Sequence, residues 1–355
     1  MKKKGFNKFV LLLLLTINNI FPFDKVAIII LDLLYYPKLK FLSSRLKLVI
    51  FLIFLSLSIS YTLNLGTASL RIFYPFLFFL GAILLSYEEI DLKKISYLFL
   101  PNIIVGILGV IYCLVSNLEP NNFVVMSWGK SIIFPICATG FSPTPQVYGT
   151  FCILYIWGCL DKNQVDFGFV LSVVGILLSQ NRTSYIFLLL ILLLYKGNWV
   201  VFLGFILFVI LLNNKEVLID IGNSQNLDSR VLLRHGFELQ FWNSNNLLTY
   251  LTGIGNNQIA PQYSRYNLDS RPYIENGLDF ILAISGFNGL ILLSIILLFY
   301  LIDLLKKRKI RICIIFMFYM MVNQWLTQEF LASSFFFFIL FVLILSEQKN
   351  NTVTN

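Results

Sequence analysis

The run FNGLILLSIILLFYLIDLL, residues 287–305, decides the fold class, because Asp303 is the one charged residue in a nearly unbroken apolar stretch. As an α-helix rising about 1.5 Å per residue, such a run approaches the ~30 Å thickness of the hydrocarbon core of a bilayer. Apolar runs of comparable length recur along the chain, with polar residues between them. This alternation predicts a bundle of membrane-spanning helices.

The bulk composition points the same way. Of the 355 residues, 58% are hydrophobic and only 13% are charged, whereas a soluble domain carries about a quarter charged residues. The net charge of +9 does not indicate nucleic-acid binding, because the basic residues are scattered between apolar runs. The five cysteines lack the spacing of a metal site or a disulfide framework, and His235 is the one histidine. We therefore expect an all-α polytopic membrane protein with no metal, no cofactor and no nucleic-acid partner.

The apolar runs predict about twelve transmembrane helices in one integral-membrane domain, residues 1–355. The amino terminus imitates a signal peptide but lacks a small-residue cleavage site, so we expect it to form the first span. The second span is the weakest and is also compatible with a re-entrant segment, and 278–285 adds a half-span or interfacial helix before Gly286. The predicted spans are 7–22, 25–36, 46–63, 72–87, 97–115, 147–160, 167–180, 184–195, 199–212, 287–305, 312–328 and 330–346.

The basic residues predict the orientation of these spans. With the amino terminus inside and the spans alternating, 18 of the 27 basic residues lie inside and nine outside, as the positive-inside rule requires. Both termini are then cytoplasmic, and two long segments lie outside, at 116–146 and 213–276. Only three of the 18 inner basic residues are arginine, against six of the nine outer ones. Since arginine binds phosphate or carboxylate with two parallel hydrogen bonds, the outer face suits a polyanion, although solvated salt bridges explain the same bias.

Arg182 is the first candidate site residue. It lies in SQNRTSYIFLLL, residues 179–190, in a turn of about four polar residues between two strongly apolar runs. A charge at membrane depth is costly unless it is paired or faces a watery cavity. The alternative is a turn arginine that extends to the lipid head groups.

A second group of candidates lies in NLDSRVLLRHGFELQFW, residues 226–242. Arg230, Arg234 and Glu238 recur at every fourth position and share one helical face, and His235 adjoins this face. The alternative interpretation is an amphipathic helix on the outer membrane surface, with its basic side toward anionic head groups.

The third group is RPYIENGLDF, residues 271–280. Glu275 and Asp279 are four residues apart, so on a helix leading into the membrane both carboxylates would share one face. A carboxylate half-removed from water, with arginines nearby, suits a general base or acid. The alternative is stabilisation of a helix start by negative charge, and Arg271 and Asp279 fit that role equally well.

The order of these features resembles the bacterial O-antigen polymerase and ligase superfamily, integral-membrane glycosyltransferases that use undecaprenyl-diphosphate-linked sugars. The likeness covers roughly residues 135–305, although 138–141 lacks an arginine that the family often carries there. The motifs are Ser179–Arg182, Ser229-Arg230, Gly253–Gly255, Glu275-Asn276 and Gly286-Phe287-Asn288-Gly289.

The resemblance implies the fold of C-type membrane glycosyltransferases, with a large periplasmic loop over a cavity in the bacterial inner membrane. It implies that Arg182 and Arg230 bind the lipid diphosphate and that Glu275 is the catalytic base. Ligases typically have histidine in the position of Glu275, so the polymerase branch is favoured. The implied substrate-binding residues are Arg234, Asn276, Arg271, His235 and Arg265.

The implied reaction joins undecaprenyl-diphosphate-linked repeat units, one as donor and one as acceptor, into O-antigen or capsular polysaccharide. A diphosphate leaves as an anion, so arginines stabilise it without a metal, and no Asp-x-Asp pair occurs at a suitable outer position. Membrane lipid and a chain-length regulator protein are the further partners to expect. The alternatives are an O-antigen ligase, or a non-enzymatic flippase or transporter of the same lipid-linked oligosaccharides.

Overall fold

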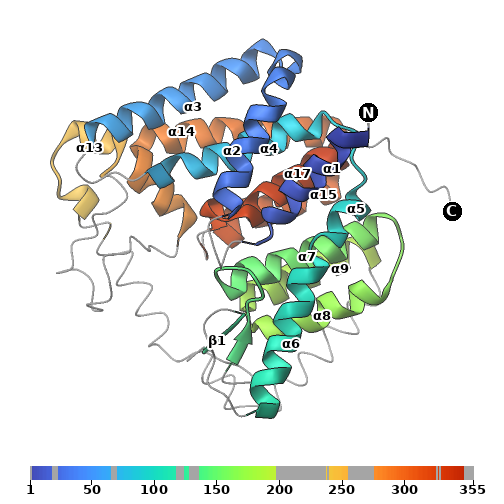
Figure 1. The fold of residues 1–355 in the computed structure, drawn as a ribbon. Coiled ribbons are helices and arrows are strands. Elements are labelled where there is room, and N and C mark those ends of the chain that lie inside the picture. Colours follow the sequence, from blue (N-terminus) through green and yellow to red (C-terminus); the bar gives the residue numbers. More distant parts are fainter. Residues whose placement is uncertain are drawn as a thin grey trace.

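The structure is a computed structural model that describes residues 2–17, 23–64, 70–116, 124–127, 136–196, 237, 240–254, 276–324, 327 and 329–347. Helices form most of it (Figure 1). The α-helices are α1 (Lys2–Leu14), α2 (Phe23–Tyr35), α3 (Ser44–Leu63), α4 (Tyr74–Ser86), α5 (Leu92–Tyr97), α6 (Leu100–Ser116), α7 (Pro145–Asp161), α8 (Phe167–Ser179), α9 (Arg182–Lys196), α13 (Leu247–Thr252), α14 (Gly277–Lys306), α15 (Ile310–Met317) and α17 (Ser333–Glu347). Shorter helical turns are η1 (Tyr36–Phe41), η2 (Leu70–Phe73), η4 (Phe318–Asn323) and η5 (Glu329–Leu331).

Within the described residues, three helical segments are long and apolar enough to cross a bilayer: α3, the α5–α6 segment Leu92–Ser116, and α14. Apolar side chains such as Leu108 and Val115 are exposed on α6, as expected of a surface that faces lipid. The molecule is thus mostly helical and contains the elements that an α-helical membrane protein requires.

Most other predicted spans also coincide with helices, but these are shorter than a bilayer requires, for example α4 and α8. The predicted span 199–212 lies outside the described residues. The number of crossings and the large loop at 213–276 therefore stay predictions.

Two short strands, which the sequence did not predict, accompany the helices. β1 (Val125–Ser127) pairs with β2 (Ile136–Ala138) in an antiparallel ribbon within the predicted loop 116–146. Val125 and Ile136 are buried, because the ribbon packs against α6 and α8. Strands of three residues are too short to show the alternation by which a strand is recognised in a sequence.

Helices α7 and α17 form the centre of the molecule, and both are buried on nearly all sides. A helix that is apolar all round needs neighbours on every face, and α17 packs against both α4 and α7. Aromatic rings fill the junction with α6: Phe337 of α17 lies edge-on to Phe99 at 5.0 Å between ring centroids and 5.9 Å from Phe151 of α7. This packing fixes the positions of α7 and α17, which carry two of the polar residues described below.

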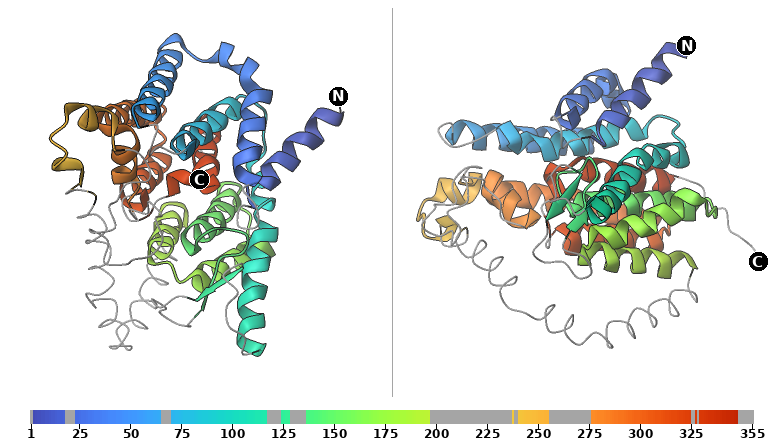
Figure 2. Two further views of the ribbon diagram at one scale, coloured as in Figure 1. Left: turned by 60° about the vertical axis from the view of Figure 1, so that its left-hand side comes forward. Right: turned by 60° about the horizontal axis from the view of Figure 1, so that its bottom comes forward.

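Helix α14 is broken at Gly286, as the half-span predicted at 278–285 required. Gly286 has φ 59° and ψ −158°, a backbone conformation that favours glycine. The nine residues before it form a short helical segment, and α13 lies against that segment at the end of α3 (Figures 1 and 2). A β-carbon at Gly286 would lie 2.5 Å from the Tyr250 carbonyl oxygen, so α13 and α14 approach closely only because this residue is glycine.

Ion pairs join the loops at the opposite end of the bundle. Glu88, after α4, pairs with Lys38 of η1 at 2.7 Å and with Lys8 of α1 at 4.0 Å. Lys307, after α14, pairs with Asp303 at 2.7 Å and with Glu347 at the end of α17 at 2.5 Å. The turns that contain Lys38, Glu88 and Lys307, and the two terminal segments that contain Lys8 and Glu347, were all predicted to lie on the inner side.

The hydroxyl of Ser60 provides a test of the α3–α13–α14 junction. It is buried and is shared between the carbonyl oxygens of Thr252 and Ile284. Ser60→Ala leaves these carbonyls without this donor, so we expect the free energy of unfolding to fall by about 1–2 kcal/mol.

The matched control is Ser58→Ala on the same helix, because the Ser58 hydroxyl is exposed and bonds only the carbonyl of Phe54 within α3. Unfolding of the detergent-solubilised variants is followed by tryptophan fluorescence. Equal losses in the two variants would show that the Ser60 contact does not hold this junction.

Candidate functional site

A buried carboxylate, Glu329, is the centre of the polar groups inside the molecule. It lies in η5, in the turn between two apolar helices, and is 2% exposed. Four side chains donate hydrogen bonds to it: Thr150 at 3.0 and 3.1 Å, Tyr319 and Asn323 each at 3.1 Å, and Ser334 at 2.9 Å. We name these five residues the Glu329 cluster. It joins α7, η4 and α17 at one point.

The environment of Glu329 sets its proton affinity. Burial raises the pKa of its carboxyl, and the hydrogen bonds from Asn323, Ser334, Thr150 and Tyr319 oppose this shift. None of the described residues forms a salt bridge with it. The carboxyl is therefore held by neutral donors, which stabilise its negative charge, and the hydroxyls among them can also accept a hydrogen bond from the protonated carboxyl.

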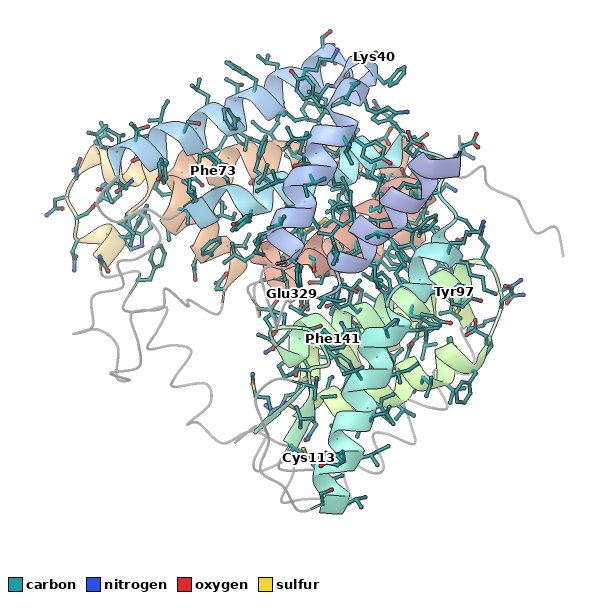
Figure 3. The ribbon with its side chains drawn as sticks, in the orientation of Figure 1. Lys40, Phe73, Tyr97, Cys113, Phe141 and Glu329 are labelled. Carbon is teal, nitrogen blue, oxygen red and sulfur yellow. The ribbon has the colours of Figure 1, made fainter. Side chains whose placement is uncertain are left out.

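Figure 3 places Glu329 in the middle of the molecule, between the group of α3, α4 and α14 and the group of α6, α7 and α9. The other end of the η5 turn is fixed by Lys25 of α2, whose amine donates to the carbonyl of Leu331. The same amine pairs with Asp24 at 2.8 Å and lies over the rings of Tyr74 and Phe78. A partly buried cation thus binds the backbone carbonyl two residues after the buried carboxylate.

Two glutamine side chains beside the cluster have unpaired atoms. Gln324, directly after η4, is fully buried, and its amide lies beside the Tyr319 hydroxyl without meeting the geometry of a full hydrogen bond. Gln146 of α7 is 7% exposed, and its amide oxygen is likewise unpaired. Buried polar groups without partners are uncommon, and each one requires an explanation.

Arg182 begins α9, and the predicted polar turn is present between α8 and α9. Asn181 supports this helix start, because its side-chain oxygen accepts from Thr183 N at 3.3 Å and its nitrogen donates to Ser184 Oγ at 2.8 Å. Ser184 lies against Gly149 of α7, where a β-carbon would clash with its hydroxyl. Gly149 immediately precedes Thr150, which belongs to the Glu329 cluster. The contact between Ser184 and Gly149 therefore places the start of α9 next to the part of α7 that carries Thr150.

Asn276 begins α14 and is 2% exposed. Its side-chain oxygen accepts from Leu278 N at 2.9 Å and from Asp279 N at 3.3 Å, so it is the capping residue of this helix. The helix begins at Gly277, and Glu275 lies outside the described residues, so the helical face predicted for Glu275 and Asp279 stays a prediction.

Gly277 brings this helix start to the Glu329 cluster. A β-carbon at Gly277 would lie 2.9 Å from the amide oxygen of Gln324 and 2.8 Å from the ring of Phe330. Phe330 directly follows Glu329 in the chain. Two sequence-predicted site residues are described by the structure, Arg182 and Asn276. Each lies at a helix start, and the residues that follow them pack against Gly149 and against Gln324 and Phe330, which are chain neighbours of the cluster.

The remaining predicted site residues cannot be placed. Those outside the described residues are Glu275, Arg230, Arg234, Arg271, His235 and Arg265. Sequence reasoning in turn missed Glu329 and Gln324, which were placed in or between the last two predicted spans. A signal was present, since 323–329 contains five polar residues between two apolar runs.

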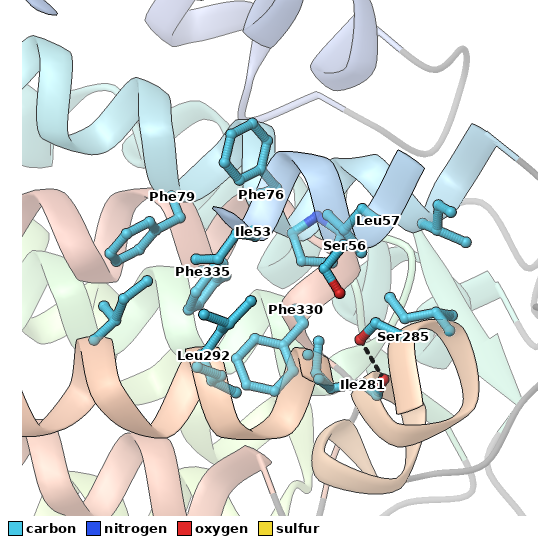
Figure 4. A pocket seen from close by; sticks show the side chains of 16 residues that line it. Ile53, Ser56, Leu57, Phe76, Phe79, Ile281, Ser285, Leu292, Phe330 and Phe335 are labelled. Carbon is cyan, nitrogen blue, oxygen red and sulfur yellow. Dashed lines mark hydrogen bonds between the residues drawn. The ribbon is translucent and has the colours of Figure 1, made fainter. Parts of the chain in front are cut away.

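An apolar groove leads away from the cluster between α3, α4 and α14 (Figure 4). Phe330 and Phe335 line it at the side of the cluster, and Ile53, Phe79 and Leu292 line it further along. Its two hydroxyl groups belong to Ser56 and Ser285, and Ser285 already donates to the carbonyl of Ile281 at 2.8 Å. The groove therefore suits a hydrocarbon chain.

Replacement of Glu329 tests the role of the cluster. Glu329→Leu removes the acceptor of four buried donors, so we expect the free energy of unfolding to fall by about 3 kcal/mol or more. Glu329→Gln keeps one acceptor oxygen, and the hydroxyls of Tyr319 and Ser334 can rotate to accept hydrogen bonds from the new amide. Its free energy of unfolding should therefore fall by less than that of Glu329→Leu. Unfolding of the purified variants in detergent is the measurement.

Glu347→Leu is the control, because this carboxylate is 71% exposed and its ion pair with Lys307 is screened by water. It should unfold within about 0.5 kcal/mol of the unmodified protein. Equal destabilisation at positions 329 and 347 would contradict a special role for the buried carboxylate.

Comparison with protein-family models, with curated proteins and with solved structures finds no match to this chain. The function must therefore be inferred from the residues and their geometry.

Proposed function

We propose that the protein is a metal-independent membrane glycosyltransferase that polymerises undecaprenyl-diphosphate-linked oligosaccharide repeat units into O-antigen or capsular polysaccharide. It acts on the periplasmic face of the bacterial inner membrane, with both termini cytoplasmic. The resemblance in motif order is one basis of the proposal, and the membrane-spanning helices are the other.

One structural observation supports the proposal most strongly. Arg182 and Asn276 belong to motifs far apart in the sequence, yet each begins a helix whose next residues contact the surroundings of Glu329. A site that holds a diphosphate and a sugar together requires residues from distant motifs to lie close to one another. Two helix starts without a common function would have no reason to lie near the same buried residue. This convergence supports a shared site for the proposed arginine and the proposed reactive position.

The charge distribution agrees with the proposed orientation. The ion pairs of Glu88 and Lys307 link turns that are all assigned to the cytoplasmic side. Asn276 and Arg182 belong to turns assigned to the opposite side. The ion pairs therefore join only turns that are assigned to the same side of the membrane, as the alternating arrangement of the spans requires. This agreement supports a site on the periplasmic side.

The proposed reaction transfers the growing chain from its lipid carrier to a new repeat unit. The hydroxyl oxygen of the acceptor sugar attacks the anomeric carbon of the donor, and the bond from that carbon to the diphosphate oxygen breaks. Arg182 and Arg230 stabilise the departing diphosphate through two-pronged hydrogen bonds, and Glu275 takes the hydroxyl proton. The groove of Figure 4 offers a place for the isoprenoid chain next to this end of the bundle.

A second function is favoured by one specific observation. Asp32 of α2 is 9% exposed, and neither carboxylate oxygen has a hydrogen-bond partner in the structure. Buried ionisable groups within membrane helices are typical of transporters, where they bind and release protons or ions. A flippase or transporter of the same lipid-linked oligosaccharides is therefore the alternative.

Deletion of the gene separates the proposed activities. A polymerase deletion should give lipopolysaccharide that carries a single repeat unit in place of a ladder of long chains on a gel. Complementation with the intact gene should restore the ladder. A surviving ladder would exclude the polymerase, whereas bare lipid A-core with accumulated lipid-linked polymer would identify a ligase.

Conservative arginine variants test the diphosphate site. Arg182→Lys and Arg230→Lys keep the positive charge but lose the fork of donors, so each should reduce polymer formation by about tenfold or more. The readout is the polysaccharide ladder in the deletion strain, with protein amounts matched by immunoblot.

Arg45→Lys is the control, because Arg45 is exposed in the first turn of α3 at the opposite end. Its ladder should match that of the unmodified protein. A normal ladder with Arg182→Lys or Arg230→Lys would remove that arginine from the mechanism.

A further inference from the structure

Three leucines of the short helix α13 are exposed. Leu247 is 71% exposed, Leu248 53% and Leu251 38%. Leu251 lies three and four residues after the other two, so all three side chains share one face of the helix. Single exposed leucines are ordinary on a protein surface, but adjacent ones form an apolar patch that indicates a partner.

Hydrogen bonding fixes the depth of this patch relative to α3. This helix has 20 residues and is apolar enough to cross a bilayer, and its length of about 30 Å matches the hydrocarbon core. The hydroxyl of Ser60, one turn before α3 ends at Leu63, donates to the carbonyl of Thr252 at the end of α13. The end of α13 therefore lies at the level of the last turn of α3.

The long part of α14 gives the same depth. Residues 287–306 follow the break at Gly286 and also span about 30 Å. The backbone of α13 lies against Gly286, where a β-carbon would be 2.5 Å from the Tyr250 carbonyl oxygen. Lys306 and Lys307 lie at the other end of this part. α13 is therefore about one hydrocarbon thickness away from these lysines, at the opposite boundary of the bilayer.

Aromatic rings accompany the leucines at this level. Trp242 is 51% exposed, and its ring centroid lies 5.8 Å from those of Tyr250 and Phe287. The hydroxyl of Tyr250 donates to the carbonyl of Trp242 at 2.6 Å, which holds the tryptophan against α13. Tryptophan and tyrosine are enriched at the head-group level of bilayers, because each combines an apolar ring with a polar atom.

The residues around the patch favour lipid as its partner. The sequence contains no charged residue between Glu238 and Arg265. The exposed polar neighbours of the leucines are asparagines, at positions 243, 245 and 246. Beside α13, the last residue of α3, Leu63, is also exposed. An apolar face with an uncharged polar edge at this depth suits the boundary between acyl chains and head groups.

We infer that Trp242 and α13 form an interfacial anchor, which lies in the boundary of the bilayer at the Leu63 end of α3. Its partner is membrane lipid, and its three leucines contact the acyl chains. The inference concerns how the chain sits in the membrane, and it does not depend on the proposed function.

The interfacial anchor holds the short first segment of α14, residues 277–285. α13 packs against this segment, and directly after α13 the amide of Ile254 donates to the carbonyl of Ala283 at 2.9 Å. The segment is separated from the rest of α14 by the break at Gly286. Its depth in the membrane is therefore set by the anchor as well as by the long part of α14.

Spin labels on single introduced cysteines test this inference in the full-length protein, whose five native cysteines are buried. Leu248→Cys and Leu251→Cys are each labelled with a nitroxide and placed in liposomes of phosphatidylcholine and phosphatidylglycerol. Collisions are measured with oxygen, which is concentrated among acyl chains, and with a nickel chelate, which stays in water. Oxygen collisions should exceed nickel collisions several-fold at both positions. The protein without an added cysteine gives the background.

Asn243→Cys is the matched control, because Asn243 is exposed directly after Trp242 in the polar edge of the patch. There the nickel collisions should dominate. Leu52→Cys gives the reference for the acyl interior, because Leu52 is exposed within α3. The label at position 248 should lie between these two depths, about 5–10 Å into the boundary.

Two results would overturn the inference. Nickel collisions at position 248 as frequent as at position 243 would show that α13 faces water. Protection of position 248 from both reagents would show that protein, and not lipid, covers the leucines. Both results are independent of whether the protein makes polymer, so the interfacial anchor and the proposed function can fail separately.

Discussion

The hydrogen bonds to the buried Glu329 carboxylate are the interactions on which the arrangement of α7, η4 and α17 depends. Its four donors come from α7, η4 and α17, and no helix pair could supply them alone. A carboxylate removed from water is costly unless its oxygens are bonded, so the three segments must meet in one register. Helices α9 and α14 are then positioned through Gly149 and Gly277, where the lack of a side chain allows close contact.

Much of the fold was predictable because it follows from hydrophobic runs and from single residues with strong local effects. The polar turn before Arg182 and the break at Gly286 were both expected from the sequence and are both present. The ribbon of β1 and β2 was not expected, because three-residue strands carry no periodic signal. The helical face expected for Glu275 and Asp279 stays a prediction, because Asn276 caps α14 and Glu275 lies outside the described residues.

The candidate site was predictable only in part, since its partners are distant in the sequence. Thr150 lies within an apolar run and donates a hydrogen bond to a residue 179 positions away, so the sequence around it does not indicate a role in a polar cluster. Glu329 was assigned to a turn between two spans, where a charged residue is ordinary. That its carboxylate points into the protein and not into water is a property of the packing of α17 against α7, which no single run of residues reveals.

We propose that this membrane-embedded chain joins saccharides and does not transport them, and a reconstituted system tests this proposal most directly. The purified protein is placed in liposomes with the lipid-linked repeat unit as the only other component, and the products are measured by mass spectrometry. We predict masses that increase by whole repeat units, together with released undecaprenyl diphosphate. Unchanged repeat units that have only crossed the bilayer would contradict the account and identify a transporter.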